Sequence, residues 1–438
     1  MTTLHQLYEQ AQCYLPGGVS ATARANPAIG HPLYVARGDG SRIYDVEGRE
    51  YVDMCMSHGA SLLGHNHPGI KAAVKQALDL GIICSYETEH HVALARRVTE
   101  LVPCAELVRF AGSGTETVMH ALRLARSVTG RDKIIKFEGH FHGYADALNF
   151  SAAPPLDDAG PADAPCAYAE SSGIPASARG DIVIIPFNDE TALEAAFAGH
   201  GAQAAALLLE PINYDQGCIL PQPGFLQQCR RLCDRYGAIL FFDEVLTAFR
   251  LAPGGAQQFL GVTPDLCVLG KAFGGGTPIS AVAGKREIMA HLRPLGRSEW
   301  SGTYLAHLTT VLGALAALEQ YSSSGFYDRL NAVGKHFYAG FQTLVQRSGV
   351  PLRLQYAGPR FGMYFGVRDE VTNYRQAARK NRALEHAFIA GCYRRGVYFA
   401  VSPHHGFSAA HTIADMDRVL DAIGGALEDV RRLEETKR

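Results

Sequence analysis

The chain has 438 residues, of which 47% are hydrophobic and 19% charged, and its formal net charge is −2. This is the composition of a globular protein with enough residues for more than one domain. It has no basic tract, no apolar run as long as a membrane span and no signal-peptide pattern at its start, and its ten cysteines are scattered. We therefore expect a cytoplasmic protein that binds neither nucleic acid nor membranes.

The first residues predict a helix, a loop and a small sheet. Apolar residues at helical spacing over residues 4–14 indicate an amphipathic helix, which ends at Pro16-Gly17-Gly18. Arg24 lies in the loop that follows, either as a surface arginine or as a clamp for a substrate carboxylate. An antiparallel meander is then predicted by three short segments between turns: residues 33–36, 42–45 and 51–54.

Two pairs of possible metal ligands occur, and neither is complete. His65 and His67 have no further histidine or carboxylate at ligand spacing, so a structural turn is favoured before the helix predicted at residues 70–80. Cys229 and Cys233 are one helical turn apart, but no second pair completes a zinc site. We predict no metal.

A glycine-rich turn follows the predicted helix 90–102 and the predicted strand 107–110. Gly112-Ser113-Gly114-Thr115 leads into another helix, which places free backbone N–H groups and two hydroxyls at a helix N-terminus. This geometry suits an anion such as a phosphate. The alternative is an ordinary helix cap by Ser113 or Thr115. The Gly-Lys-Ser/Thr ending of a Walker loop is missing.

The next stretch contains a candidate stacking residue and a long irregular segment. A strand at residues 133–137 runs into Phe141, which lies near glycines and either covers a heterocycle or packs in the core. Residues 151–180 are rich in Ala, Pro, Ser, Gly and Asp and show no periodicity. We interpret them as a mobile flap near the active site or as a disordered surface insertion.

Strands and helices then alternate, which predicts a mostly parallel sheet with helices on both faces. Two further buried strands are predicted at residues 181–186 and 204–211, with helices at 191–198 and 225–235. After a strand at 279–284, the chain continues with long helices and a mixture of strands and helices, typical of a smaller α+β domain: residues 308–321, 327–346 and 352–438.

Two strand ends carry the strongest chemical signal. The apolar run 236–242 ends in Asp243, and the apolar segment 266–269 is followed by Lys271 and a glycine run. Open α/β sheets bind ligands at the carboxyl ends of their strands. An aspartate and a lysine at such ends suit pyridoxal phosphate, because the carboxylate balances the protonated pyridine nitrogen and the lysine forms a Schiff base. The alternative is two ordinary strand ends, a helix cap and a solvated charge.

Taken in order, these motifs resemble those of the class III, fold-type I, pyridoxal-phosphate aminotransferases, and most of all the branch that contains glutamate-1-semialdehyde 2,1-aminomutase. The specific matches are residues 112–116, 241–250 and 264–271. The resemblance implies an α/β fold: a large domain with a mostly parallel seven-stranded sheet flanked by helices, and a smaller α+β domain from the N- and C-terminal segments. The expected ranges are 1–58 and 307–438 for the small domain and 59–306 for the large one.

Carried over by position, the resemblance implies roles at the cofactor. Lys271 would hold the cofactor and move a proton, and Asp243 would keep the pyridine nitrogen protonated. Val245 and Phe141 would cover the two faces of the ring. The remaining cofactor-binding positions are Ser113, Gly114 and Thr115 at the phosphate, Glu210 and His142 near the ring, and Thr303, which would reach the phosphate of the neighbouring subunit. A shared site of this kind implies an obligate homodimer.

Departures from the family pattern lie around the substrate. Phe141 replaces a tyrosine, and Asp215 stands where an asparagine is common. His58 takes the place of a tryptophan of the pocket, and His404-His405 replaces a segment that carries a glutamate. The 151–180 flap is longer and lacks a compact gate, which an aminomutase needs to retain its intermediate.

These departures favour an intermolecular aminotransferase with a ping-pong mechanism over the aminomutase. Its donor would be an amino acid or amine with a carboxylate bound by Arg24, its acceptor a keto acid, and His58 and His405 would also contact substrate. A cofactor-binding regulatory or scaffold protein is a third possibility, against which the intact Lys271 and Asp243 argue.

Overall fold

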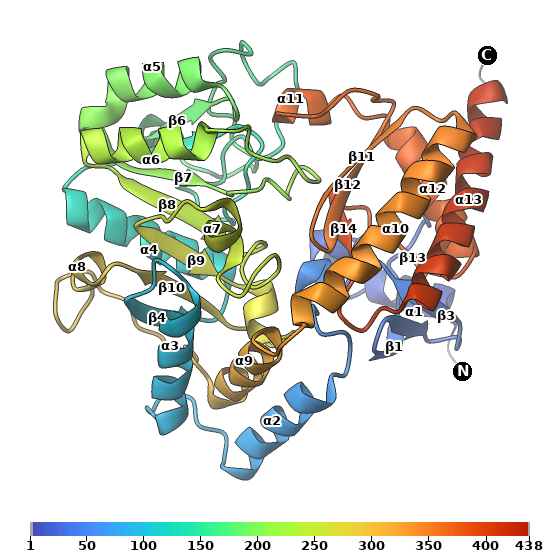
Figure 1. Ribbon diagram of the computed structural model, residues 1–438, viewed down its shortest axis with the longest axis horizontal. Coiled ribbons are helices and arrows are strands. Elements are labelled where there is room, and N and C mark those ends of the chain that lie inside the picture. Colours follow the sequence, from blue (N-terminus) through green and yellow to red (C-terminus); the bar gives the residue numbers. More distant parts are fainter. Residues whose placement is uncertain (1–2, 437–438) are drawn as a thin grey trace. The chain divides into compact units, whose positions relative to one another are not determined.

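The computed structural model describes residues 3–436, and the chain divides into two compact units. The terminal unit comprises Met1–Pro68, Gly325–Glu370 and Arg379–Arg438, and the central unit comprises Gly69–Ser324 and Val371–Ala378. Residues 69–324 of the central unit run from light blue to gold in Figure 1.

The boundaries of these units differ from the proposed domain ranges. Residues 59–68 belong to the terminal unit, and residues 307–324 and 371–378 belong to the central unit. The outermost residues of the proposed ranges, 1–2 and 437–438, lie outside the described residues.

A seven-stranded sheet forms the middle of the central unit, in the order β4-β10-β9-β8-β7-β5-β6. Strands β5 to β9 pair in parallel, and only β10 runs antiparallel to its neighbours β4 and β9. This confirms the predicted mostly parallel sheet. The strands are β4 Leu107–Ala111, β5 Lys133–Phe137, β6 Ile182–Ile185, β7 Ala204–Leu209, β8 Ile239–Glu244, β9 Leu266–Leu269 and β10 Ser280–Gly284.

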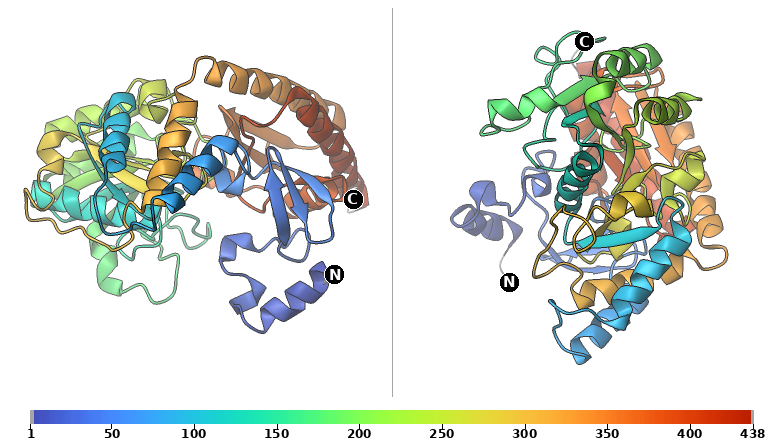
Figure 2. Two further views of the ribbon diagram at one scale, coloured as in Figure 1. Left: turned by 90° about the horizontal axis from the view of Figure 1, so that it is seen from below. Right: turned by 90° about the vertical axis from the view of Figure 1, so that its left-hand side faces the viewer.

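Helices cover both faces of this sheet, as Figures 1 and 2 show. Helix α4 packs across β4 and β7–β10, and α5 and α6 pack on β6, β7 and β8. Every residue of β7 and β8 is buried, as expected of strands covered on both faces. The helices of the unit are α2 Pro68–Asp79, α3 Glu89–Leu101, α4 Gly114–Thr129, α5 Glu190–His200, α6 Phe225–Tyr236, α7 Gly255–Leu260, α8 Arg286–Met289, α9 Leu308–Tyr321 and α11 Tyr374–Ala377.

The terminal unit contains two small sheets, β1-β2-β3-β13 and β11-β12-β14. The predicted meander is present as β1 to β3, with both pairs antiparallel. The strands are β1 Val35–Asp39, β2 Arg42–Asp45, β3 Glu50–Asp53, β11 Leu352–Ala357, β12 Arg360–Phe365, β13 Val397–Tyr398 and β14 His404–Gly406. The long helices are α1 Leu4–Gln12, α10 Phe326–Ser348, α12 Arg382–Arg394 and α13 Ile413–Thr436.

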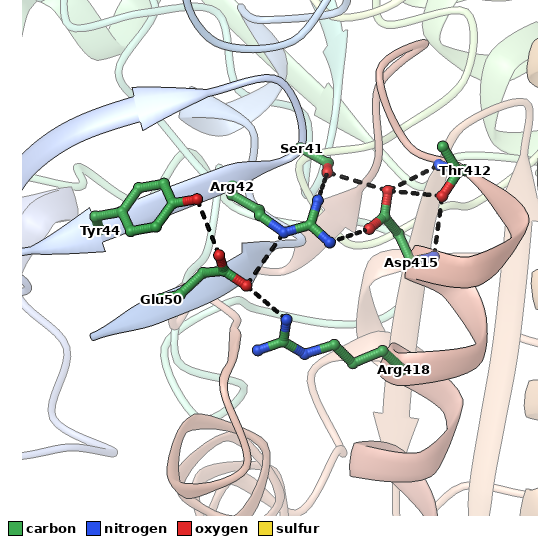
Figure 3. A network of polar contacts seen from close by, with 7 residues as sticks. All are labelled: Ser41, Arg42, Tyr44, Glu50, Thr412, Asp415 and Arg418. Atoms are coloured by element: carbon green, nitrogen blue, oxygen red, sulfur yellow. Dashed lines mark hydrogen bonds and ion pairs between the residues drawn. The ribbon is translucent and has the colours of Figure 1, made fainter. Parts of the chain in front are cut away.

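A network of ion pairs joins distant parts of the sequence inside the terminal unit (Figure 3). Arg42 on β2 contacts Asp415 in the first turn of α13 at 2.7 Å and Glu50 on β3 at 3.2 Å. Arg418 on α13 also contacts Glu50, at 2.6 Å. The network therefore fastens the last helix of the chain to its first sheet.

Across residues 3–436, no helix combines the length and the apolar character that crossing a bilayer requires.

Candidate active site

Three predicted site residues follow neighbouring parallel strands of the central sheet. Glu210 comes directly after β7, Asp243 lies near the end of β8, and Lys271 follows β9. Because β7, β8 and β9 pair in parallel, these residues lie along the same carboxyl edge. The strand order thus brings together an acid, a second acid and an amine that are far apart in the sequence.

Asp243 is held by two donors. One carboxylate oxygen lies 2.8 Å from Nδ1 of His142, and the other accepts the N–H of Val245 at 3.1 Å. His142 is only 2% exposed, and this burial lowers its pKa. A neutral imidazole that carries its proton on Nδ1 donates a hydrogen bond to the Asp243 carboxylate. Its other nitrogen, Nε2, is buried and has no hydrogen-bond partner among the described residues.

The glycine-rich turns converge on two side chains. A Cβ added at Gly114 or at Gly270 would lie 3.1 or 3.2 Å from the methyl groups of Val245. A Cβ at Gly143 would lie 2.7 Å from the hydroxyl oxygen of Thr115. The predicted phosphate turn, Val245 two positions after Asp243, and Gly270 directly before Lys271 are therefore packed against one another at distances that leave no room for larger side chains.

The turn before α4 is both a helix cap and an open N-terminus. The hydroxyl of Ser113 accepts the N–H of Glu116 at 3.3 Å, and the Glu116 carboxylate accepts the N–H of Gly112 at 3.0 Å. The N–H groups of Gly114 and Thr115 belong to the first turn, which has no intrahelical acceptor. The two alternatives considered for this turn are thus compatible, because the cap leaves donors available for an anion.

Glu210 organises the loop that carries Phe141. Its carboxylate accepts backbone N–H groups from Phe141 and Tyr214 at 3.2 Å each and from Asp215 at 3.3 Å. Burial raises the pKa of Glu210 well above its usual value, and the negative charges of Asp215 and Asp243 raise it further. The ring of Phe141 is half-buried and meets Tyr144 edge-on at 5.1 Å.

Lys271 has an unusual backbone and a perturbed amine. Its φ of 46° is in the left-handed region, which non-glycine residues rarely adopt and which is a mark of functional positions. Burial lowers the pKa of its amine to about 8, although Asp243, Asp215 and Glu210 oppose this shift. An amine with this pKa is partly neutral near physiological pH and can act as a nucleophile or base.

Two further charged residues neighbour this cluster: Lys136, which is absent from the residues predicted to form the site, and Asp215, which departs from the family pattern. Lys136 on β5 is 0% exposed, donates to the carbonyl of His140 at 3.0 Å, and has a pKa lowered by burial to about 8. Burial raises the pKa of Asp215 to about 6, against the pull of Lys271. The sequence signal available for Lys136 was its position between apolar residues of a strand, because burying a charge costs free energy unless the charge has a partner.

Thr303 lies in a different part of the central unit. It is exposed, and its carbonyl accepts a hydrogen bond from Ser85 at 3.3 Å. Both residues line a pocket of about 680 Å³ that includes none of the other predicted site residues. Two of the residues that line it, Tyr86 and Val92, are large, strongly exposed hydrophobic ones, and so is Tyr304, which follows Thr303 in the chain.

The predicted substrate residues belong to the terminal unit. Arg24 is exposed and donates to the hydroxyl of Ser20. His58 has a left-handed φ of 52° and meets His404 edge-on at 6.4 Å. His405 is fully buried beside phenylalanine rings, and its burial lowers the pKa well below the usual value. Their roles toward substrate stay predictions.

The central cluster fits pyridoxal phosphate. The first turn of α4 offers N–H donors for a phosphate, Asp243 offers a fixed carboxylate for a ring nitrogen, and Lys271 offers an amine for an aldehyde. The packing of Gly114 and Gly270 on Val245 shapes one side of the space between them. The buried Nε2 of His142 is a further polar atom that a bound group can engage.

Comparisons with known proteins agree with this chemistry. Residues 23–402 match the family model of the class-III aminotransferases. Glutamate-1-semialdehyde 2,1-aminomutase 2 of Brevibacillus brevis is 38% identical over 420 residues, which cover 95% of this chain and 96% of the relative.

Two solved structures are also similar over nearly their whole length. An omega-transaminase from Sphaerobacter thermophilus has a TM-score of 0.91 and 33% identity, with 98% of each chain covered. A transaminase with pyridoxal phosphate bound has a TM-score of 0.88 and 27% identity, with 99% of this chain and 98% of that chain covered. The chain therefore belongs to the class-III aminotransferases and is a pyridoxal-phosphate-dependent enzyme.

Proposed function

We propose that this enzyme moves an amino group from an amino acid or amine to a keto acid in two half-reactions. The single observation that supports this most is the convergence of Lys271, Asp243 and the turn before α4 on the carboxyl edge of the sheet. Pyridoxal phosphate supplies an electron-poor ring that stabilises the negative charge left on a substrate carbon when its proton is removed.

The protein side chains provide the proton transfer and the electrostatics. Lys271 would take the proton from the reacting carbon of the donor in the first half-reaction. In the second it would give a proton to the carbon of the acceptor, and its pKa of about 8 suits both directions. Asp243, fixed by His142, would pair with the ring nitrogen. Val245 and Phe141 would pack on the ring, and Ser113, Gly114 and Thr115 would hold the phosphate.

The substrate class follows from Arg24. Its guanidinium presents parallel N–H donors that match a carboxylate, and it is exposed to solvent. We assign it to the carboxylate of a donor whose amine lies beyond the α position, a choice that fits the likeness to an omega-transaminase. His58 and His405 would shape the same pocket. Replacement of Arg24 by alanine should raise KM for carboxylated donors much more than for amines without a carboxylate.

We further propose a cytoplasmic homodimer that shares its sites through Thr303. Strongly exposed hydrophobic residues of the central unit that a second copy would cover include Tyr86 and Val92, which line the pocket of Thr303, and Tyr304, which follows Thr303 in the chain. All ten cysteines are free thiols, as expected in a reducing compartment. Sedimentation of the purified enzyme should give twice the mass of one chain, and a monomer with full activity would contradict the shared site.

The second candidate is intramolecular transfer by an aminomutase. It is favoured by the 38% identity to a glutamate-1-semialdehyde 2,1-aminomutase. One experiment separates the two. The enzyme is incubated with a panel of amino donors, and the absorbance of its cofactor is followed before and after a keto acid is added. Transfer predicts a stable spectral change with the donor alone that the keto acid reverses. Conversion of glutamate 1-semialdehyde without any keto acid, and no change with the other donors, would establish the aminomutase instead.

A further inference from the structure

A buried ion pair lies directly before the loop that carries Phe141 and His142. Glu138, immediately after β5, is 2% exposed, and its two carboxylate oxygens accept hydrogen bonds from Nη2 and Nε of Arg375 at 2.9 and 3.0 Å. This two-point contact is the strongest geometry that an arginine and a carboxylate can adopt. Arg375 belongs to the short helix α11, although more than two hundred residues separate it from Glu138 in the chain.

The same arginine also binds the beginning of the long irregular segment. Its guanidinium donates to the carbonyls of Gly160 at 2.8 Å, Ala159 at 3.0 Å and Pro161 at 3.1 Å. The neighbouring Tyr374 hydroxyl donates to the carbonyl of Pro154. Helix α11 therefore fastens residues 154–161, within the segment predicted to be a flap or a disordered insertion, to the end of β5.

The backbone next to Glu138 is packed against α11 as well. Gly139 has a φ of 82°, and a Cβ added there would lie 2.6 Å from the Cβ of Tyr374. The carbonyl of Gly139 accepts a hydrogen bond from the side chain of Asn213 at 3.0 Å. The start of the Phe141–His142 loop is thus confined on two sides, so its position depends on where α11 lies.

The charges of the pair depend on each other. Burial raises the pKa of Glu138, and the hydrogen bonds and positive charge of Arg375 oppose that shift. Removal of one partner from a buried ion pair leaves an uncompensated charge, which is far more damaging than removal of both. The pair is consequently expected to behave as one unit in mutational tests.

We propose that Arg375 is a positioning residue for the cofactor: with Glu138 it forms a latch that fixes the Phe141–His142 loop and ties residues 154–161 to it. This inference rests on the proposed function, because it assigns the loop to the cofactor ring. It also gives a reason why residues 371–378 belong to the central unit while the chain on either side of them belongs to the terminal unit.

The latch is tested with the holoenzyme by the rate at which pyridoxal phosphate leaves it and by the circular dichroism of its visible band. R375M and E138Q should each release the cofactor at least tenfold faster and weaken the visible circular dichroism. The double variant should be no worse than either single one, since both changes break the same contact. R375K, which keeps the charge and part of the hydrogen bonding, should recover part of the loss.

Arg379 provides a matched control, because it is an exposed arginine four positions further along the same segment. R379M should keep the wild-type release rate and dichroism. The proposal is wrong if R375M also keeps them, or if the effects of R375M and E138Q multiply in the double variant. If a single variant does not fold, the charge-free double variant decides, since a double variant with the wild-type release rate would contradict the latch. A wild-type protein that binds no cofactor would refute the proposed function and not the latch itself.

Discussion

The two units use charged residues in opposite ways. In the terminal unit, the network of Arg42, Glu50, Asp415 and Arg418 is partly exposed, and every carboxylate in it faces an arginine (Figure 3). In the central unit, the acids at the cofactor site are buried together with two lysines of lowered pKa. The first arrangement fastens two segments of chain at low cost. The second is unfavourable for stability and is explained by the chemistry it makes possible.

The pKa values of Glu50 in the terminal unit and Asp215 in the central unit are shifted in opposite directions. Hydrogen bonds from Arg418 lower the pKa of Glu50, so that its ionised form stabilises the fold. Burial raises the pKa of Asp215 to about 6, so that its ionised form destabilises the fold. Variants of residues in both regions test this difference.

Loss of the reactive amine should have the largest effect. K271A is expected to abolish transamination and the absorbance that depends on the amine, because no other group in the site can replace the base at that position. Absorbance spectra and turnover with a reactive donor are the measurements. K75A, which removes an exposed lysine of α2, is the control and should behave as wild type. Substantial turnover in K271A would disprove the role of Lys271.

Neutralisation of Asp243 should come next. D243N keeps the shape of the side chain but removes the charge opposite the ring nitrogen, and we expect kcat/KM to fall at least a hundredfold, or ~3 kcal/mol in the transition state. Steady-state kinetics with one donor measure it. D146N, at an exposed position of the same unit, should leave kcat/KM unchanged. If kcat/KM fell less than threefold in D243N, the charge of Asp243 would not be a main source of transition-state stabilisation.

A stability measurement on Asp215 sharpens the contrast. Because the folded-state pKa of about 6 lies above the usual value of 3.8, the folded state binds the extra proton between these values, and stability falls as pH rises through that window. D215N removes the ionised form, so its Tm should exceed that of wild type above pH 7, by an amount equivalent to ~1 kcal/mol, and the gain should vanish near pH 4. A Tm difference independent of pH would contradict the buried charge.

The smallest effect is expected in the network of the terminal unit. The pKa of Glu50 is lowered in the folded state. Its ionised form therefore stabilises the fold above the usual pKa of 4.5, and this stabilisation is lost as pH falls through the folded-state pKa. E50Q should therefore lower Tm at pH 7 by an amount equivalent to ~0.5 kcal/mol, less so at high salt, and leave the cofactor spectrum unchanged. This sign is opposite to that expected for D215N. If E50Q and D215N changed Tm at pH 7 in the same direction, the two regions would not differ in the way described.

Local patterns were sufficient for the parts of the site that lie at strand ends and turns. Apolar runs that end in Asp243 or precede Lys271 mark buried strands, and a glycine-rich turn before a helix marks the phosphate-binding geometry. These features are read from consecutive residues, so they do not depend on the rest of the fold.

Contacts between distant segments had no such signature. The carboxylate of Glu210 was assigned only a position near the cofactor, yet it accepts three backbone N–H groups from two loops. Lys136 and Arg375 were not assigned to the site at all, since nothing near either residue in the sequence indicates a partner on another element. Residues 371–378 lie within the range expected for the small domain but group with the central unit, and no local pattern marks them.

The family resemblance, the alternation of strands and helices, and the placement of Asp243 and Lys271 after buried strands could all be predicted from the sequence, because they depend on residue type and local periodicity. Tertiary structure decided how that chemistry is supported: the strand order that places Glu210, Asp243 and Lys271 at one edge, the neutral His142 beside Asp243, and the Glu138–Arg375 pair. Burial and charge–charge interactions set the pKa values of these groups, and both arise only when segments remote in the chain are packed together.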